Sequence, residues 1–114
     1  MIALNSQSKV YVALQPVDFR KGILGLKSQT REFLRQTPDS GTFFLFRNKR
    51  KTAIKILVYD GQGFWLLMKR LSRGKFPWWP EGIGRGIDLD YRKLQLIINA
   101  AVEAEFSEDW KSLY

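Results

Sequence analysis

The chain has 114 residues, 45% of them hydrophobic and 14% aromatic, which is enough apolar material for one packed domain and too little length for two. It contains no cysteine and no histidine, which excludes disulfides, thiolate nucleophiles, Cys/His zinc sites and Ser-His-Asp catalysis. The net charge is +8, and residues 1–87 carry +11, from 16 basic and 5 acidic side chains. Such a basic balance is typical of nucleic-acid binders, although excess lysine that serves only solubility is the alternative.

We expect a single domain over residues 1–114, with a core over about 8–105 and an acidic tail over 106–114. No apolar run approaches the roughly 20 residues that a membrane span needs. The N-terminus also lacks the basic and apolar regions of a signal peptide, so we expect a cytoplasmic protein with no membrane partner.

The first elements in the chain are predicted to be a strand and a helix. Residues 10–14 are rich in β-formers and predict a strand. Apolar side chains then recur every three or four positions and predict a helix over 19–36, with Asp18 as its N-cap. Gly22 and Gly25 weaken such a helix and indicate either close packing or a later start.

Three further apolar runs, separated by short turns, predict a β-meander. They cover residues 42–46, 53–59 and 64–69, with turns at 47–52 and 60–63. Residues 75–79 are a candidate for a fourth strand of the meander, placed at a sheet edge by Pro77.

A glycine-rich loop over 81–87 leads to a second predicted helix over 90–105, capped by Asp88 or Asp90. The fold class is therefore α+β, an antiparallel β-meander of about four to five strands packed with two helices. Because both faces of the strands are largely apolar, we expect the helices on one face and another body, such as a partner subunit, over part of the other.

The predicted topology gathers positive charge at one end of the sheet, because alternate loops of a meander lie at the same end. Seven cations in or beside these loops can contact phosphates, namely Arg47, Lys49, Arg50, Lys51, Arg70, Arg73 and Lys75. The alternative is that they are ordinary solvated loop residues. The neighbouring Trp78 and Trp79 form either an interface, with exposed bases or with protein, or part of the core.

Signals for catalysis are weak. The segment Gly82-Ile83-Gly84-Arg85-Gly86 lacks the spacing of a dinucleotide or Walker loop and is better explained as a connector. Asp18, Asp60 and Glu81 are the acids that a metal-dependent nuclease would use, but they fall among predicted caps and turns. We therefore predict no enzyme activity, no catalytic residue, no metal site and no cofactor.

Several motifs in order carry a family resemblance. They are Pro16-Val17-Asp18-Phe19-Arg20-Lys21-Gly22, Phe46-Arg47-Asn48-Lys49-Arg50, Ile54-Lys55-Ile56-Leu57, Tyr59-Asp60-Gly61-Gln62-Gly63-Phe64 and Lys69-Arg70-Leu71-Ser72-Arg73-Gly74-Lys75-Phe76. Over residues 8–105 the chain resembles the small TnpB, or second-open-reading-frame, accessory protein of insertion-sequence-66-type transposable elements. One departure is Asp88-Leu89-Asp90-Tyr91, where family members often open the last helix with threonine or serine and proline.

The resemblance implies a bacterial mobile-element protein, encoded beside a larger transposase and needed for efficient transposition. It supplies no catalytic residues. The leading hypothesis is a non-catalytic factor that binds the DNA of element ends through its phosphate backbone, with Arg20 and Lys21 as further contacts near a helix N-terminus. The alternative is an adaptor that binds the transposase without touching DNA, and a second copy of the chain is a further candidate partner.

Overall fold

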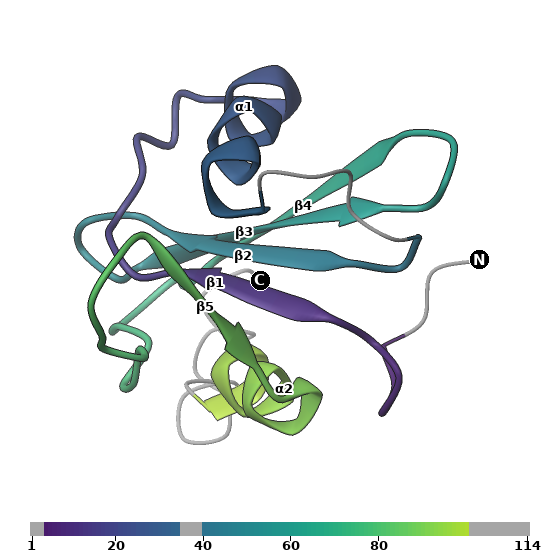
Figure 1. Ribbon diagram of the computed structural model, residues 1–114. Coiled ribbons are helices and arrows are strands. Elements are labelled where there is room, and N and C mark those ends of the chain that lie inside the picture. Colours follow the sequence, from purple (N-terminus) through teal and green to yellow (C-terminus); the bar gives the residue numbers. More distant parts are fainter. Residues whose placement is uncertain (1–3, 35–39, 101–114) are drawn as a thin grey trace, which may run out of the picture.

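Five strands and two helices make up the described part of the chain (Figure 1). The structure is a computed structural model, which describes residues 4–34 and 40–100. The strands are β1 Val10–Ala13, β2 Phe43–Arg47, β3 Ala53–Tyr59, β4 Phe64–Arg70 and β5 Gly86–Leu89. The helices are α1 Ile23–Leu34 and α2 Tyr91–Ala100.

The strands form one sheet in the order β4-β3-β2-β1-β5. Strands β2, β3 and β4 are the antiparallel meander that the sequence predicts. Strand β1 lies parallel to β2, because α1 carries the chain back across one face of the sheet between them (Figure 1). Strand β5 is antiparallel to β1 and forms the other edge. The predicted α+β fold is confirmed, with one parallel pair added to an otherwise antiparallel sheet.

The fifth strand is not the segment that the sequence suggests. Residues 75–79 are irregular, and Phe76 and Trp79 within them are buried against the sheet. The proline between them has no N–H to give to a ladder. Strand β5 comes instead from residues 86–89, part of which was expected to be loop, and Ile87 aligns with Val12 of β1.

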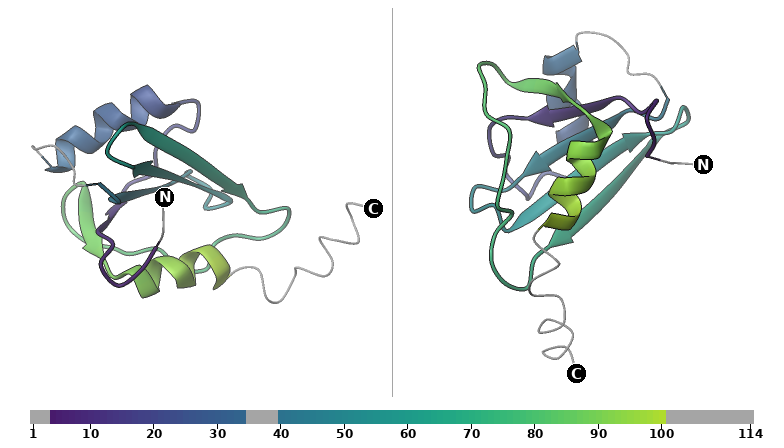
Figure 2. Two further views of the ribbon diagram at one scale, coloured as in Figure 1. Left: turned by 90° about the vertical axis from the view of Figure 1, so that its right-hand side faces the viewer. Right: turned by 90° about the horizontal axis from the view of Figure 1, so that it is seen from below.

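One helix covers each face of the sheet, as the views from two further directions also show (Figure 2). Leu94 of α2 belongs to the same buried cluster as Ile54 of β3. Leu26 of α1 belongs to the cluster of Leu57, which lies on the opposite face of that strand. The expectation that both helices share one face is therefore wrong, because strands that are apolar on both sides need cover on both.

The two helices begin differently. Helix α1 starts at Ile23 rather than near Phe19, and its first helical bond runs from Leu26 N–H to the carbonyl of Gly22 at 3.0 Å. Asp18 lies in a turn before the helix and does not cap it, which corrects the prediction. Asp90 does cap α2, since its Oδ1 accepts from the backbone N–H of residue 92 at 2.7 Å. The predicted helix ends at 35–36 and 101–105 and the acidic tail 106–114 lie outside the described residues.

Candidate nucleic-acid interface

Two basic segments lie side by side at one end of the sheet. They are the β2–β3 loop, residues 48–52, and the stretch after β4, residues 71–76 (Figure 1). Leu71 N–H donates to the carbonyl of Thr52 at 2.9 Å, and Phe76 N–H donates to the carbonyl of Lys51 at 2.8 Å. These two hydrogen bonds join loops that are about 20 residues apart in the sequence, so the convergence that the meander predicts is present in the structure.

The side chain of Asn48 shapes the β2–β3 loop. Its Oδ1 accepts from the backbone N–H groups of residues 52 and 53 at 2.9 and 3.1 Å, and its Nδ2 donates to Thr52 Oγ1 at 2.8 Å. Lys51 adopts φ +60°, a left-handed conformation that closes the loop onto the carbonyl of Asn48. The loop is thus held by internal bonds that leave the tip residues, Lys49 and Arg50, exposed to solvent.

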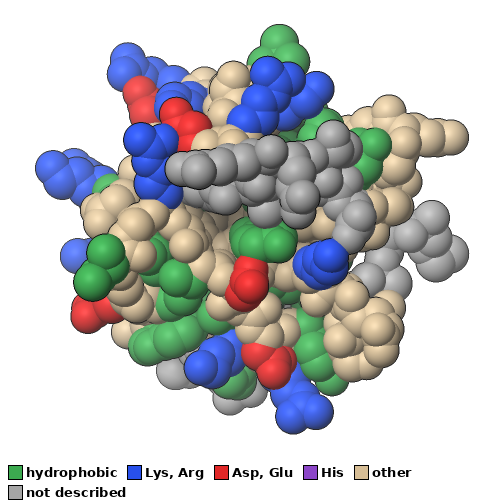
Figure 3. Space-filling view, viewed as in Figure 1, with side chains coloured by type: hydrophobic (Ala, Val, Ile, Leu, Met, Phe, Trp, Pro, Cys, Tyr) green, Lys and Arg blue, Asp and Glu red, His purple; other side chains and the backbone are tan. Residues whose placement is uncertain are grey.

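Five of the seven predicted cations are exposed, and we call them the basic patch: Lys49, Arg50, Arg70, Arg73 and Lys75. Lysine and arginine side chains project from the left-hand edge of the molecule in Figure 3, on the side where Figure 1 draws the β2–β3 loop. The two remaining cations, Arg47 and Lys51, are half-buried. Charges that share one face and remain hydrated can bind a polyanion without a conformational change.

Arg47 is packed into the protein. Its guanidinium lies 5.8 Å from the ring centroid of Trp79, and its Nη1 donates to the carbonyls of Asn48 and Lys49 at 3.2 and 3.4 Å. Its buried Nε has no hydrogen-bond partner in the described part of the chain. Burial lowers the pKa of this guanidinium from its usual value. Arg47 therefore holds the base of the β2–β3 loop against the protein. It does not belong to the exposed basic patch.

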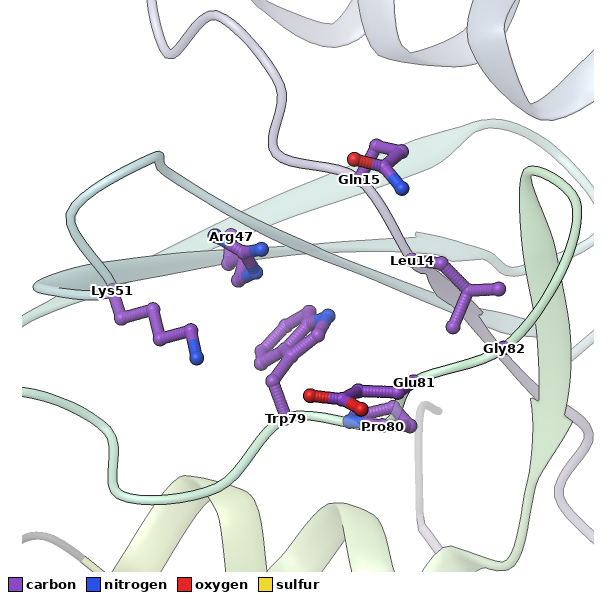
Figure 4. A pocket seen from close by; sticks show the side chains of 8 residues that line it. All are labelled: Leu14, Gln15, Arg47, Lys51, Trp79, Pro80, Glu81 and Gly82. Atoms are coloured by element: carbon purple, nitrogen blue, oxygen red, sulfur yellow. The ribbon is translucent and has the colours of Figure 1, made fainter.

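A pocket of about 240 Å³ opens beside Arg47 (Figure 4). Figure 4 shows the Trp79 ring between Arg47 and the chain at Pro80, with the carboxylate of Glu81 nearby. Trp79 is only 5% exposed, and its Nε1–H donates to the carbonyl of Ala13 at 3.0 Å. The ring therefore belongs to the core and exposes too little surface to stack on a nucleotide base.

The two tryptophans, for which an interface and the core were both open, differ in burial. Trp79 is buried, as the core alternative has it, whereas Trp78 is 45% exposed. The ammonium of Lys93, on α2, lies 6.0 Å from the centroid of the Trp78 ring. The indole of Trp78 thus remains the accessible one of the two.

Arg20 and Lys21 lie in the turn that precedes α1. The Asp18 carboxylate accepts from Arg20 Nη2 at 2.6 Å and from Nε at 3.0 Å, and these bonds lower the pKa of Asp18 to about 2. Lys21 Nζ donates to Gln29 Oε1 at 3.1 Å. The charge of Arg20 is therefore matched by a neighbouring carboxylate, and Arg20 is a weaker phosphate donor than the members of the basic patch.

Two strand lysines have structural roles that the sequence pattern does not predict. Lys55 is 7% exposed, and its Nζ donates to the carbonyls of Phe19 and Lys21 at 2.8 and 2.9 Å. Lys69 Nζ donates to the carbonyl of Ile98, in the last turn of α2, at 2.5 Å. A single lysine within an apolar strand was the available signal, because such a residue must find buried acceptors.

The acids proposed for a nuclease do not converge. No group of three or more acidic side chains that could hold a metal ion occurs within residues 4–34 and 40–100. Asp60 instead closes the 60–63 turn, where its Oδ1 accepts from the N–H groups of Gln62 and Gly63, both at 2.8 Å. Within the same described ranges, no helix is long and apolar enough to cross a membrane.

Comparisons with known proteins agree with the resemblance read from the motifs. The family described as "IS66 Orf2 like protein" matches residues 8–107. Two similar proteins come from Sinorhizobium fredii. Uncharacterized protein y4hO is 30% identical over 97% of this chain and 96% of its own length. Uncharacterized protein y4jC is 40% identical over 67% of this chain and 65% of its own length. No solved structure matches significantly.

Proposed function

Since the chain belongs to the IS66 Orf2-like family, which consists of accessory proteins of IS66 transposition, we propose that it is a non-catalytic factor that binds DNA through the basic patch. The observation that carries the proposal is the pair of hydrogen bonds between the loops 48–52 and 71–76. They hold cations from two separate segments on one surface. Such a surface suits a polyanion with regularly spaced charges.

The patch is suited to the phosphate backbone rather than to base edges. Its members are exposed lysines and arginines on short loops, whereas direct reading of bases needs a helix or a two-stranded ribbon in the major groove. On duplex DNA the slope of log affinity against log salt is about −0.9 for each phosphate neutralised. Engagement of most of the patch therefore gives a steep salt dependence and little discrimination between sequences.

The test is fluorescence anisotropy of the protein, freed of nucleic acid, against labelled element-end DNA and a scrambled duplex, with salt titrated on both. The variant Lys49→Ala/Arg50→Ala removes two tip cations of the patch. The matched control Arg31→Ala/Arg92→Ala removes the same charge from exposed sites on the two helices. We expect the tip variant to bind more weakly with a flatter salt slope and the control to change little. Equal effects of the two variants, or no binding at low salt, would contradict the proposal.

An adaptor that binds the transposase is the second candidate, and the exposed indole of Trp78 favours it. Tryptophan is enriched among residues that dominate protein interfaces. Co-purification of the two proteins in the presence of a nuclease, lost on Trp78→Ala and kept in Lys49→Ala/Arg50→Ala, would assign the function to protein binding. A complex that forms without the nuclease, and that either the nuclease or the tip variant disperses, would mean that DNA bridges the two proteins.

A further inference from the structure

Strand β4 is a long and unprotected edge of the sheet. It has seven residues, and in the described part of the chain β3 is its one neighbour. It contains neither glycine nor proline. Natural proteins usually guard such an edge with a proline, a bulge or an outward lysine, because its free N–H and C=O groups can pair with another strand. The opposite edge, β5, is four residues long.

The hydrogen bonds at the two ends of the β3–β4 hairpin show which backbone groups of β4 do not bond to β3 and are open to another strand. Asp60 N–H donates to the Gly63 carbonyl at 3.1 Å, and Leu71 N–H donates to the Thr52 carbonyl at 2.9 Å. Hydrogen-bonded pairs alternate along an antiparallel ladder, so residues 65, 67 and 69 direct their backbone groups toward β3. Four residues direct theirs away from the sheet: Phe64, Leu66, Met68 and Arg70.

Three apolar side chains along this edge are exposed, together with the charged side chain of Arg70 at its end. Trp65 is 57% exposed, Leu67 52% and Met68 50%. The ammonium of Lys69 turns toward α2 and donates to the carbonyl of Ile98. Burial lowers the pKa of that ammonium. The edge therefore combines open backbone groups with apolar side chains on both faces of the strand.

We propose that β4 pairs with β4 of a second copy of this chain, antiparallel and about a twofold axis at Leu67. The two sheets then become one continuous sheet. This register places Leu66 opposite Met68 and Phe64 opposite Arg70 of the other copy, so all four open positions exchange backbone bonds. A shift of two residues in either direction leaves Phe64 or Arg70 without a strand residue opposite it.

Charge complementarity favours a second copy over an unrelated strand. In this register Arg70 lies opposite Phe64 of the other copy, so its guanidinium meets an aromatic ring, and no like charges occupy facing positions. The 60–63 turn of one copy lies beside residues 71–75 of the other. The Asp60 carboxylate of the first turn thus approaches the cations of the second segment.

The first test is the mass of the full-length protein in solution, by light scattering coupled to size-exclusion chromatography. We expect a dimer. Met68→Pro removes an N–H that the β3–β4 ladder does not use, so it should give a folded monomer, whereas Met68→Ala should stay dimeric. Circular dichroism verifies the fold of each variant. A monomeric wild type at the highest soluble concentration, or a folded Met68→Pro that remains dimeric, would overturn the proposal.

The second test needs no proline and uses the absence of cysteine from the chain. Leu67 would face Leu67 of the other copy in a non-hydrogen-bonded pair, with about 4.5 Å between the Cα atoms. That distance suits a disulfide. We expect Leu67→Cys to form a covalent dimer under mild oxidation much faster than Ile83→Cys, a control whose native side chain is 99% exposed on a loop. Equal rates for the two variants would place the contact elsewhere.

This inference does not depend on DNA binding, since it rests on β4 and on the turns that flank it. A strand of the transposase added to the same edge is the competing arrangement. It predicts a monomer that binds the transposase and loses it on Met68→Pro. That result would overturn the homodimer while keeping β4 as the contact surface.

Discussion

The ammonium of Lys55 donates a hydrogen bond of 2.8 Å to the backbone carbonyl of Phe19, 36 residues away in the sequence. The same nitrogen donates to the carbonyl of Lys21 at 2.9 Å and lies 5.0 Å from the centroid of the Phe19 ring. A strand of the meander thereby holds the turn before α1 against the sheet. The two carbonyls bond to a side chain rather than to helical N–H groups, in agreement with the start of the helix at Ile23.

Replacing Lys55 with methionine should destabilise the protein. Methionine keeps most of the apolar stem but leaves two carbonyls without their donor, and hydrogen bonds to charged groups are worth about 1.5–3 kcal/mol. We expect the free energy of unfolding to fall by about 2 kcal/mol in urea denaturation. Lys49→Met, in the exposed tip of the loop, should change it by less than about 0.5 kcal/mol. Similar effects at the two positions would mean that the Lys55 bonds contribute little.

The two adjacent tryptophans should differ sharply in their contribution to stability. Trp79 is 5% exposed and bonded to Ala13, and truncation of a buried aromatic residue costs about 3–5 kcal/mol. Trp78 is 45% exposed and should cost less than about 1 kcal/mol. Urea denaturation of Trp79→Ala and Trp78→Ala measures both. A larger loss for Trp78→Ala would contradict the placement of Trp79 in the core.

The meander was predictable because local signals determine it. The Asp60-Gly61-Gln62-Gly63 turn and the apolar runs around it set both the strand boundaries and the end of the sheet where the cations gather. The burial of Trp79 and the parallel pairing of β1 were not predictable, because each depends on contacts between distant segments. A pair of aromatics beside basic loops has the same sequence pattern whether it packs inward or points outward.

The positions of the charged side chains were also predictable only in part. Meander topology predicts that the segments 48–52 and 71–76 lie at the same end of the sheet, and hydrogen bonds join them there in the structure. The sequence could not separate Arg47, which packs on Trp79, from the exposed Arg50 three residues later. It also could not identify Lys55 as structural, since only the fold brings the carbonyls of the 19–21 turn within reach of its ammonium.

The cap of α2 offers a matched pair of aspartates. Asp90 Oδ1 accepts from the N–H of residue 92 at 2.7 Å, whereas Asp88 is an exposed residue of β5. Loss of an N-cap aspartate costs about 1 kcal/mol. We expect Asp90→Ala to lower the free energy of unfolding by about that amount and Asp88→Ala to leave it nearly unchanged. A reversed order of the two variants would contradict the assignment of the cap.

The stability of the protein should decline in acid partly through Asp18. Bonds from Arg20 lower the pKa of Asp18 from its usual 3.8 to about 2 in the folded state. A carboxyl with a depressed folded pKa stabilises the fold above its unfolded pKa, and that contribution is lost as the pH falls through the folded pKa. Bonds from Gln62 and Gly63 also lower the pKa of Asp60, so it acts in the same direction.

Urea midpoints measured from pH 5 to pH 2 test this linkage. The wild type should lose stability progressively below about pH 4, and Asp18→Asn should lose less over the same interval because it has no proton to bind there. Asp88→Asn removes an equal charge from an exposed position and should follow the wild type. If Asp18→Asn followed the wild-type curve instead, the bond between Asp18 and Arg20 would be too weak in solution to withhold that guanidinium from a phosphate.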